Sequence, residues 1–225
     1  MPASTVSHTS PAAPVTAPAP AKAAAIRQAM VLTAARWLPQ RGMAAVNLVE
    51  VARAVGAPRG SIYHYFAGGR DQLLQEALAL AGKSGLRLID TARRHANTPE
   101  DLVRALFNTG QLQIQARSSS EAGFSGGCPV GAAVLSSETE TPAFHAALQT
   151  IFEGWHTALA DAFVAISTAT PLEAQRWARS SLVAYEGALV CAKATASPAA
   201  AAEVFSTAAD MVTALIMLKS VEQRK

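Results

Sequence analysis

The segment GAPRGSIYHYF, residues 56 to 66, concentrates side chains that can contact a nucleic acid. It brings a guanidinium, hydroxyls and an imidazole together just after a glycine, and such groups bind phosphate oxygens and base edges in a major groove. Gly60 would let the backbone approach closely. The alternative is that these rings are surface or packing residues. The side chains expected to contact DNA here are Arg59, Ser61, Tyr63, His64 and Tyr65.

Other reactive side chains form weaker patterns. Cys128 lies between Gly127 and Pro129, where a helix can begin, and a helix N-terminus lowers the pKa of a thiol. Cys128 is therefore either a thiol sensor or a small packed residue at a bend. His145 and His156 lie without a clear third ligand, so we predict neither a metal site nor a cofactor. An enzyme with Cys128 as its nucleophile is the main rival reading, but no paired acid and base or glycine-rich phosphate loop supports it.

The elements that position these residues are predicted to be helices throughout. Alanine is abundant, and no stretch alternates as a strand would. Four pairs of a hydroxyl residue and proline, at 98–99, 141–142, 170–171 and 197–198, are typical of helix starts. No apolar run is expected to reach membrane-spanning length. The predicted helices cover 22–40, 48–55, 58–65, a long one from Arg70 or Asp71, 98–118, a short one after Pro129, 141–167, 170–195 and 197–219.

The two short helices near the start of the chain have helix-turn-helix spacing. Asn47 suits an N-cap for 48–55, and Gly56 suits the turn before 58–65. Ile62 and Phe66 are four residues apart and should face a small core. Through Ala81 there are seven basic and three acidic residues, whereas the remainder of the chain has twelve basic and thirteen acidic residues. This asymmetry indicates a polyanion partner for the N-terminal third alone.

The stretch NLVEVARAVGAPRGSIYHYFAGGRDQLL, residues 47 to 74, resembles the DNA-binding domain of the TetR family of transcriptional repressors. The resemblance implies a homodimer that binds double-stranded operator DNA and is released by a small-molecule effector. Cys128 and Cys191 lie far apart without a metal-ligand pattern, which fits a cytoplasmic protein, and no membrane partner is expected. The resemblance adds Asn47 and Arg70 to the expected DNA contacts. Pro58 departs from the usual hydroxyl cap, and Arg70 replaces the usual lysine while still able to contact a phosphate.

A second stretch, GFSGGCPVGAAVLSSE at residues 123 to 138, is similar to a branch related to flavonoid- and lincomycin-responsive repressors. That resemblance favours a planar, mainly hydrophobic effector. Most rings beyond residue 100 must be core, but some should line a cavity with a few polar neighbours. The expected ligand-binding residues are Phe107, Gln111, Cys128, Phe152, Trp155, His156, Tyr185 and Glu186.

The last two helices have the pattern of a dimer interface. Ala184, Ala188 and Ala192 recur every four residues, and 204–218 carries an apolar stripe, so the pair could form a four-helix contact with a second copy. An intramolecular core is the alternative. We therefore expect a disordered tail (1–21), a helix-turn-helix DNA-binding domain (22–68) and a ligand-binding and dimerisation domain (69–225). An architectural DNA binder without an effector would not need so large a body.

Overall fold

The computed structural model describes residues 20–58, 60, 62–118, 127–136, 142–195 and 197–222. All regular elements in these ranges are helices, which confirms the all-α class. We call residues 22–68 the head and 69–225 the body; this division stays a prediction. The helices are α1 (Pro20–Arg41), α2 (Leu48–Ala54), α3 (Ile62–Tyr65), α4 (Gly69–Arg94), α5 (Pro99–Ser118), α6 (Pro129–Val134), α7 (Pro142–Val164), α8 (Pro171–Lys193) and α9 (Pro198–Glu222).

The hydroxyl caps act as the sequence predicts. The Thr170 hydroxyl oxygen accepts from the Glu173 backbone N–H at 3.3 Å, and the Glu173 carboxylate accepts from the Thr170 N–H at 2.9 Å, which makes a capping box. Thr98 and Ser197 likewise accept from backbone N–H groups in the first turns of α5 and α9, at 3.1 and 3.2 Å. Thr141 lies outside the described residues.

Two helix ends differ from the prediction. The first helix was predicted to cover 22–40, but α1 continues through Pro39 to Arg41, one residue farther, and Gly42 at φ +77° follows. A proline near a helix end costs little backbone bonding, whereas glycine adopts the left-handed conformation that stops the helix. In the recognition region α3 begins at Ile62 and not at Pro58.

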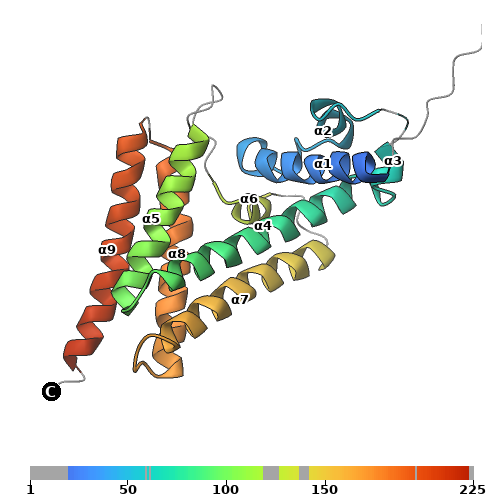
Figure 1. Cartoon of the computed structure of the whole chain (residues 1–225). Coiled ribbons are helices and arrows are strands. Elements are labelled where there is room, and N and C mark those ends of the chain that lie inside the picture. The colour runs from blue at the N-terminus through green and yellow to red at the C-terminus, as the bar shows by residue number, and fades with distance from the viewer. Residues whose placement is uncertain are drawn as a thin grey trace, which may run out of the picture.

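The helices form two groups joined by α4. Figure 1 shows α1, α2 and α3 at one end of the molecule and α5, α8 and α9 together at the other, with α4 running between them. Gly56, at φ +69°, makes the turn between α2 and α3, as predicted. The head closes on buried Leu38, Val51 and Phe66, all fully inaccessible.

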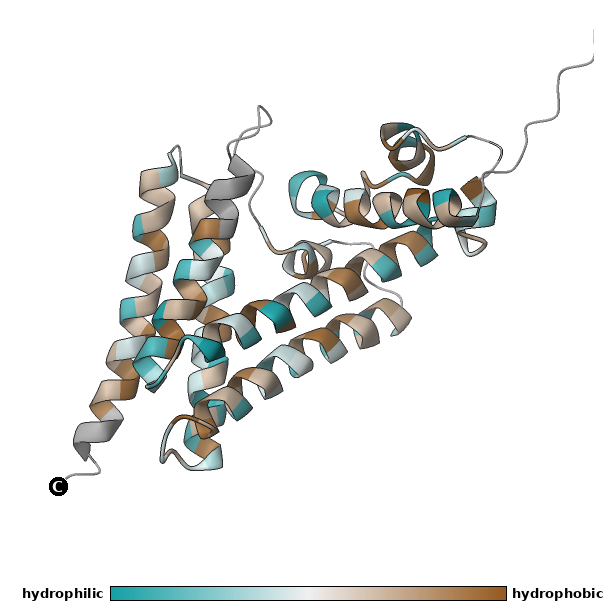
Figure 2. Ribbon diagram, viewed as in Figure 1, coloured by the Kyte–Doolittle hydropathy of each residue, from teal (hydrophilic) through white to brown (hydrophobic). Residues whose placement is uncertain are grey.

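Helix α9 is more apolar than predicted, since no apolar run was expected to reach membrane-spanning length. By length and composition its stretch Pro198–Leu218 could cross a membrane, although 39% of that stretch is buried inside the protein. Figure 2 shows hydrophobic positions recurring along the coloured part of α9. One face of α9 packs on α5 and α8, where Phe205 is buried, while Met211 and Leu218 are exposed. The apolar composition therefore reflects two hydrophobic faces, of which one is uncovered in the protomer.

Candidate DNA-binding face and effector cleft

The candidate DNA-binding face is centred on α3. Tyr63 and His64 are exposed there, with 71% of Tyr63 accessible. Gly60, just before the helix, is exposed as well. Arg59 and Ser61 lie outside the described residues, so their expected DNA contacts stay predictions. The phenol and the imidazole are free to meet a phosphate or a base edge.

Tyr65 is buried, so the expectation that it faces DNA is wrong. Only 7% of the residue is accessible, and its hydroxyl is buried without a hydrogen-bond partner in the described structure. Ile62, Tyr65 and Phe66 are three and four residues apart, so they share one face of the helix and all point into the head. The spacing of three from Ile62 is the sequence signal that places Tyr65 inside.

The side chains of Asn47 and Arg70 both form hydrogen bonds with backbone groups. The Asn47 side-chain oxygen accepts from the Val49 N–H at 2.8 Å and caps α2, as predicted. The Arg70 guanidinium donates to the carbonyls of Val46 at 2.9 Å and Met43 at 2.5 Å. Arg70 thus ties the start of α4 to the segment between α1 and α2. A phosphate contact by either residue stays a prediction.

Arg27 is a positioning residue that the sequence argument missed. Its Nε donates to the Tyr65 carbonyl at 3.1 Å, its guanidinium lies 4.9 Å from the Phe66 ring centroid, and it forms an ion pair with Glu76. One side chain therefore connects α1, α3 and α4. These partners are 38 and 49 residues away, so no local pattern could reveal them.

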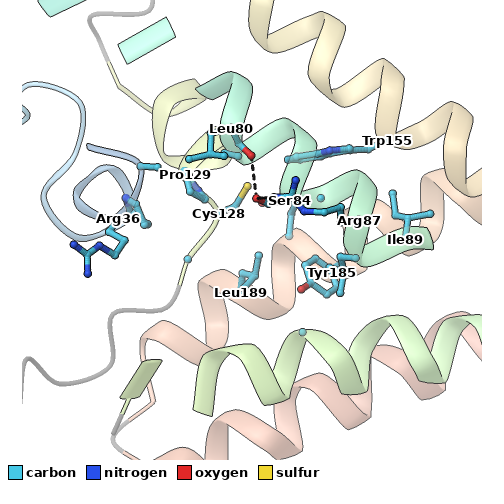
Figure 3. Close-up of a pocket in the computed structure, with 18 of the residues that line it drawn as sticks. Arg36, Leu80, Ser84, Arg87, Ile89, Cys128, Pro129, Trp155, Tyr185 and Leu189 are labelled. Atoms are coloured by element: carbon cyan, nitrogen blue, oxygen red, sulfur yellow. Dashed lines mark hydrogen bonds between the residues drawn. The ribbon is translucent and has the colours of Figure 1, made fainter. Parts of the chain in front are cut away.

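A cleft of about 680 Å³ lies where the head meets the body. Helix α1 forms one side through its last three turns, and α4, α6 and α8 form the others, with two residues each from α5 and α7. Figure 3 shows Arg36, Leu80, Cys128, Trp155 and Tyr185 among the side chains around it. The volume is in the range of small-molecule sites.

Half of the predicted ligand-binding residues line this cleft. Cys128, Trp155, Tyr185 and Glu186 do so, although they are far apart in the sequence. The structure places the other four elsewhere: Phe107, Gln111, Phe152 and His156.

Three of these four residues have a clear structural role. Phe107 is 1% exposed and meets Tyr185 edge to face, with ring centroids 5.5 Å apart. Phe152 packs behind Trp155 at 5.3 Å. The His156 Nε2 lies 3.0 Å from the carbonyl oxygen of Gln175. The helices carry these side chains on faces that turn away from the cleft.

The aromatic walls of the cleft depend on glycines. The Trp155 indole N–H donates to the Gly82 carbonyl at 2.8 Å, and a Cβ on Gly85 would lie 2.4 Å from the indole ring. A Cβ on Gly110 would lie 2.2 Å from the Tyr185 hydroxyl. Only glycine leaves room for the two rings against α4 and α5.

Cys128 and Glu186 meet at the cleft, where both are half-buried. The Cys128 Sγ accepts from the Gly131 N–H at 3.3 Å, as the N-cap of α6. Burial, and then the Glu186 charge, raise the pKa of the Cys128 thiol, and burial raises the pKa of Glu186. These shifts favour the small packed residue over the thiol sensor, which would need the pKa lowered by a helix N-terminus. A protonated thiol is a weak nucleophile, so neither a redox sensor nor an enzyme using Cys128 is favoured.

Three arginines that line the cleft were not among the predicted ligand-binding residues. Arg36 and Arg41 come from α1, and Arg87 comes from α4. Arg41 lies over the Trp37 ring, 3.9 Å from its centroid, and Arg87 donates to the Ser84 hydroxyl at 2.8 Å. Each arginine lies on the polar side of an ordinary amphipathic helix, so the sequence gives no sign that the three are neighbours. They come together because α1 packs on the body. Within the described ranges, no group of three His, Cys, Asp or Glu residues could hold a metal ion.

Comparison with known proteins agrees with both halves of this arrangement. The model of the tetR family of bacterial regulatory proteins matches residues 31–77, and the LmrA/YxaF-like C-terminal domain of transcriptional regulators matches residues 109–205. The HTH-type transcriptional regulator Rv0196 of Mycobacterium tuberculosis is 31% identical over 172 residues, which cover 74% of this chain and 84% of the relative.

Solved structures share the fold at lower identity. The regulatory protein TetR of Rhodobacter sphaeroides superposes with a TM-score of 0.69 at 21% identity, over 82% of this chain and 97% of that one. AibR, in complex with isovaleryl coenzyme A and operator DNA, gives a TM-score of 0.58 at 18% identity, over 83% of this chain and 97% of its own.

The fold and the exposed α3 face define a helix-turn-helix DNA-binding protein with a helical body. The chain belongs to the tetR family, and it is a transcriptional regulator of that family. The C-terminal domain model that matches residues 109–205 does not name an effector, so a response to flavonoids or lincomycin stays a prediction.

Proposed function

We propose that this regulator is a repressor whose operator affinity is set by a small molecule in the cleft between head and body. The observation that carries this proposal is that one cleft is lined both by α1 of the head and by α4 and α8 of the body. A molecule bound there contacts both parts at once. It can shift the head only by binding two arrangements with different affinity.

Polar contacts connect the helices around the cleft with the recognition helix α3. Lys193 at the end of α8 donates a hydrogen bond to the Pro39 carbonyl near the end of α1. At the other end of α1, Arg27 holds the Tyr65 carbonyl and pairs with Glu76 of α4. A ligand that displaces α1 from α4 and α8 therefore changes the support of α3.

The uncovered faces of α8 and α9 support a homodimer. Val183 and Val190 of α8 are 69% and 62% exposed, and Met211 and Leu218 of α9 are 68% and 67% exposed. We call these four residues the dimer face. Two copies packed through it would form a four-helix contact and present two heads to one DNA duplex.

The small-residue stripe predicted to form this contact faces inward. Ala188 is 4% exposed and Ala192 is fully buried, because both pack inside the protomer. The dimer face occupies the opposite side of α8, so Ala188 is a poor site for testing assembly.

A dimer with two α3 faces suits a near-palindromic operator with half-sites about one helical turn apart. We propose a cytoplasmic, non-enzymatic role without a membrane. AibR, which shares the fold, is known with both an acyl coenzyme A and operator DNA, so the fold can accommodate both kinds of ligand.

Operator release measured by fluorescence anisotropy tests the proposal. The labelled duplex is taken from the DNA upstream of the gene, and the panel contains aromatic, aliphatic, sugar and metal-ion candidates. We expect release by an apolar or aromatic compound, and Gly85→Ala should blunt it because the new Cβ displaces Trp155 from the cleft wall. Release by a sugar or metal ion alone would contradict the cleft proposal.

A further inference from the structure

The cleft is chemically different at its mouth and on its floor. Buried residues form the floor, among them Ile89, Leu159 and Leu189, at 5%, 1% and 7% exposure. The exposed lining residues form the mouth, and these include Arg36, Arg41 and Arg87. A bound molecule therefore meets apolar surface inside and positive charge where the cleft opens.

Among the residues that the structure describes, the arginines of the mouth have no acidic partner. Arg36 donates to the Thr33 hydroxyl at 3.3 Å and Arg87 to the Ser84 hydroxyl, but neither is ion-paired in the described part of the chain. By contrast, Arg94 on the same helix as Arg87 pairs with Asp90. Guanidinium groups beside an apolar cavity are well suited to bind a carboxylate or phosphate.

The acid that the described lining contains, Glu186, does not neutralise this charge. Glu186 lies half-buried beside Cys128, and burial raises its pKa, although a hydrogen bond with Cys128 lowers it in part. A ligand carboxylate placed beside Glu186 would bring two acidic groups together, and like charges at close range disfavour the ionised form of both. An acidic ligand should thus keep its charged end at the mouth.

We propose, on the basis of the effector cleft above, that the effector is an amphipathic organic anion. Its ring or chain lies on the floor against Trp155 and Tyr185, and its carboxylate or phosphate lies at the mouth within reach of Arg87 and Arg36. The acidic group then contacts α1 and α4 together, which are the two elements that position α3.

Matched probes separate charge from shape. Isothermal titration calorimetry compares 2-naphthoate with 2-naphthamide and 2-naphthylmethylamine, and decanoate with decanamide and decylamine. Decanoyl coenzyme A tests phosphate as the source of the anion. We expect each acid to bind about tenfold more tightly than its amide, and the amine most weakly, as for one charge-assisted contact at a partly exposed site. If only the coenzyme A ester binds, the anion is a phosphate.

Variants locate the anion. Arg87→Gln and Arg36→Gln should each remove most of the preference for the acid while leaving amide binding unchanged. Lys83→Gln removes the same charge from α4 outside the cleft lining and should keep the preference. Circular dichroism checks that each variant is folded.

Equal binding of acid and amide, tighter binding of the amine, or no binding by any probe would overturn the proposal. So would a preference for the acid that survives both arginine variants. Operator release by an uncharged apolar compound would then still uphold the proposed function, whereas failure of every compound to release the operator would count against that function itself.

Discussion

Replacing Val190 by glutamate tests the dimer face. Val190 is 62% exposed in the protomer, so a charged side chain there should leave the fold of one chain intact. In a two-fold dimer the same patch is used on both subunits, so a single substitution places two carboxylates in one interface. The change therefore acts on assembly and not on the protomer.

The size of the effect follows from the exposure of Val190. Full burial of such a side chain contributes about 1.5–3 kcal/mol, and with 62% of it still to be buried, two copies contribute roughly 2–4 kcal/mol. Losing that amount raises the dissociation constant roughly 30- to 700-fold. Repulsion between the two carboxylates adds to the loss.

Light scattering over a dilution series measures the change. Wild type should stay dimeric at concentrations where Val190→Glu is monomeric, and operator affinity should fall with the dimer. Leu135→Glu is the matched control, since Leu135 is 81% exposed after α6 and lies off the dimer face. Ala188→Glu should instead lower the free energy of unfolding, because Ala188 is buried. A Val190→Glu protein as dimeric as the control would refute the dimer face.

Three further predictions follow from single side chains. Tyr63→Ala should weaken binding to operator and scrambled duplexes by similar factors, whereas Tyr65→Phe should leave both unchanged because the hydroxyl is buried; a loss with Tyr65→Phe in gel shifts would contradict this. The raised folded-state pKa of Glu186 means that its contribution to stability is present below the ordinary carboxyl pKa and is lost as pH rises through the raised value. Urea unfolding across this range should therefore show less loss of stability for Glu186→Gln than for wild type, and parallel pH profiles would count against it. A thiol reagent such as DTNB should modify exposed Cys191 well before Cys128, whose pKa is raised by burial; faster labelling of Cys128 would restore it as a sensor.

The sequence by itself determined the local structure and the family. Hydroxyl–proline pairs marked the starts of α5, α8 and α9, because capping depends on residues within one turn. Gly56 located the turn between α2 and α3 because a residue at positive φ is best served by glycine. These signals act over a few residues, and a single chain displays them directly.

The effector cleft and the dimer face depended on tertiary structure. Four expected ligand contacts lie away from the cleft, and the arginines of its mouth come from two helices about fifty residues apart, Arg36 and Arg87. Periodicity shows that a helix has an apolar face, but not which neighbour covers it. Ala188 and Val190 illustrate the point, since one is buried and the other exposed two residues later on α8. The docking of α1 on the body and of α9 on α8 decided these assignments, because contacts between distant segments leave no local pattern.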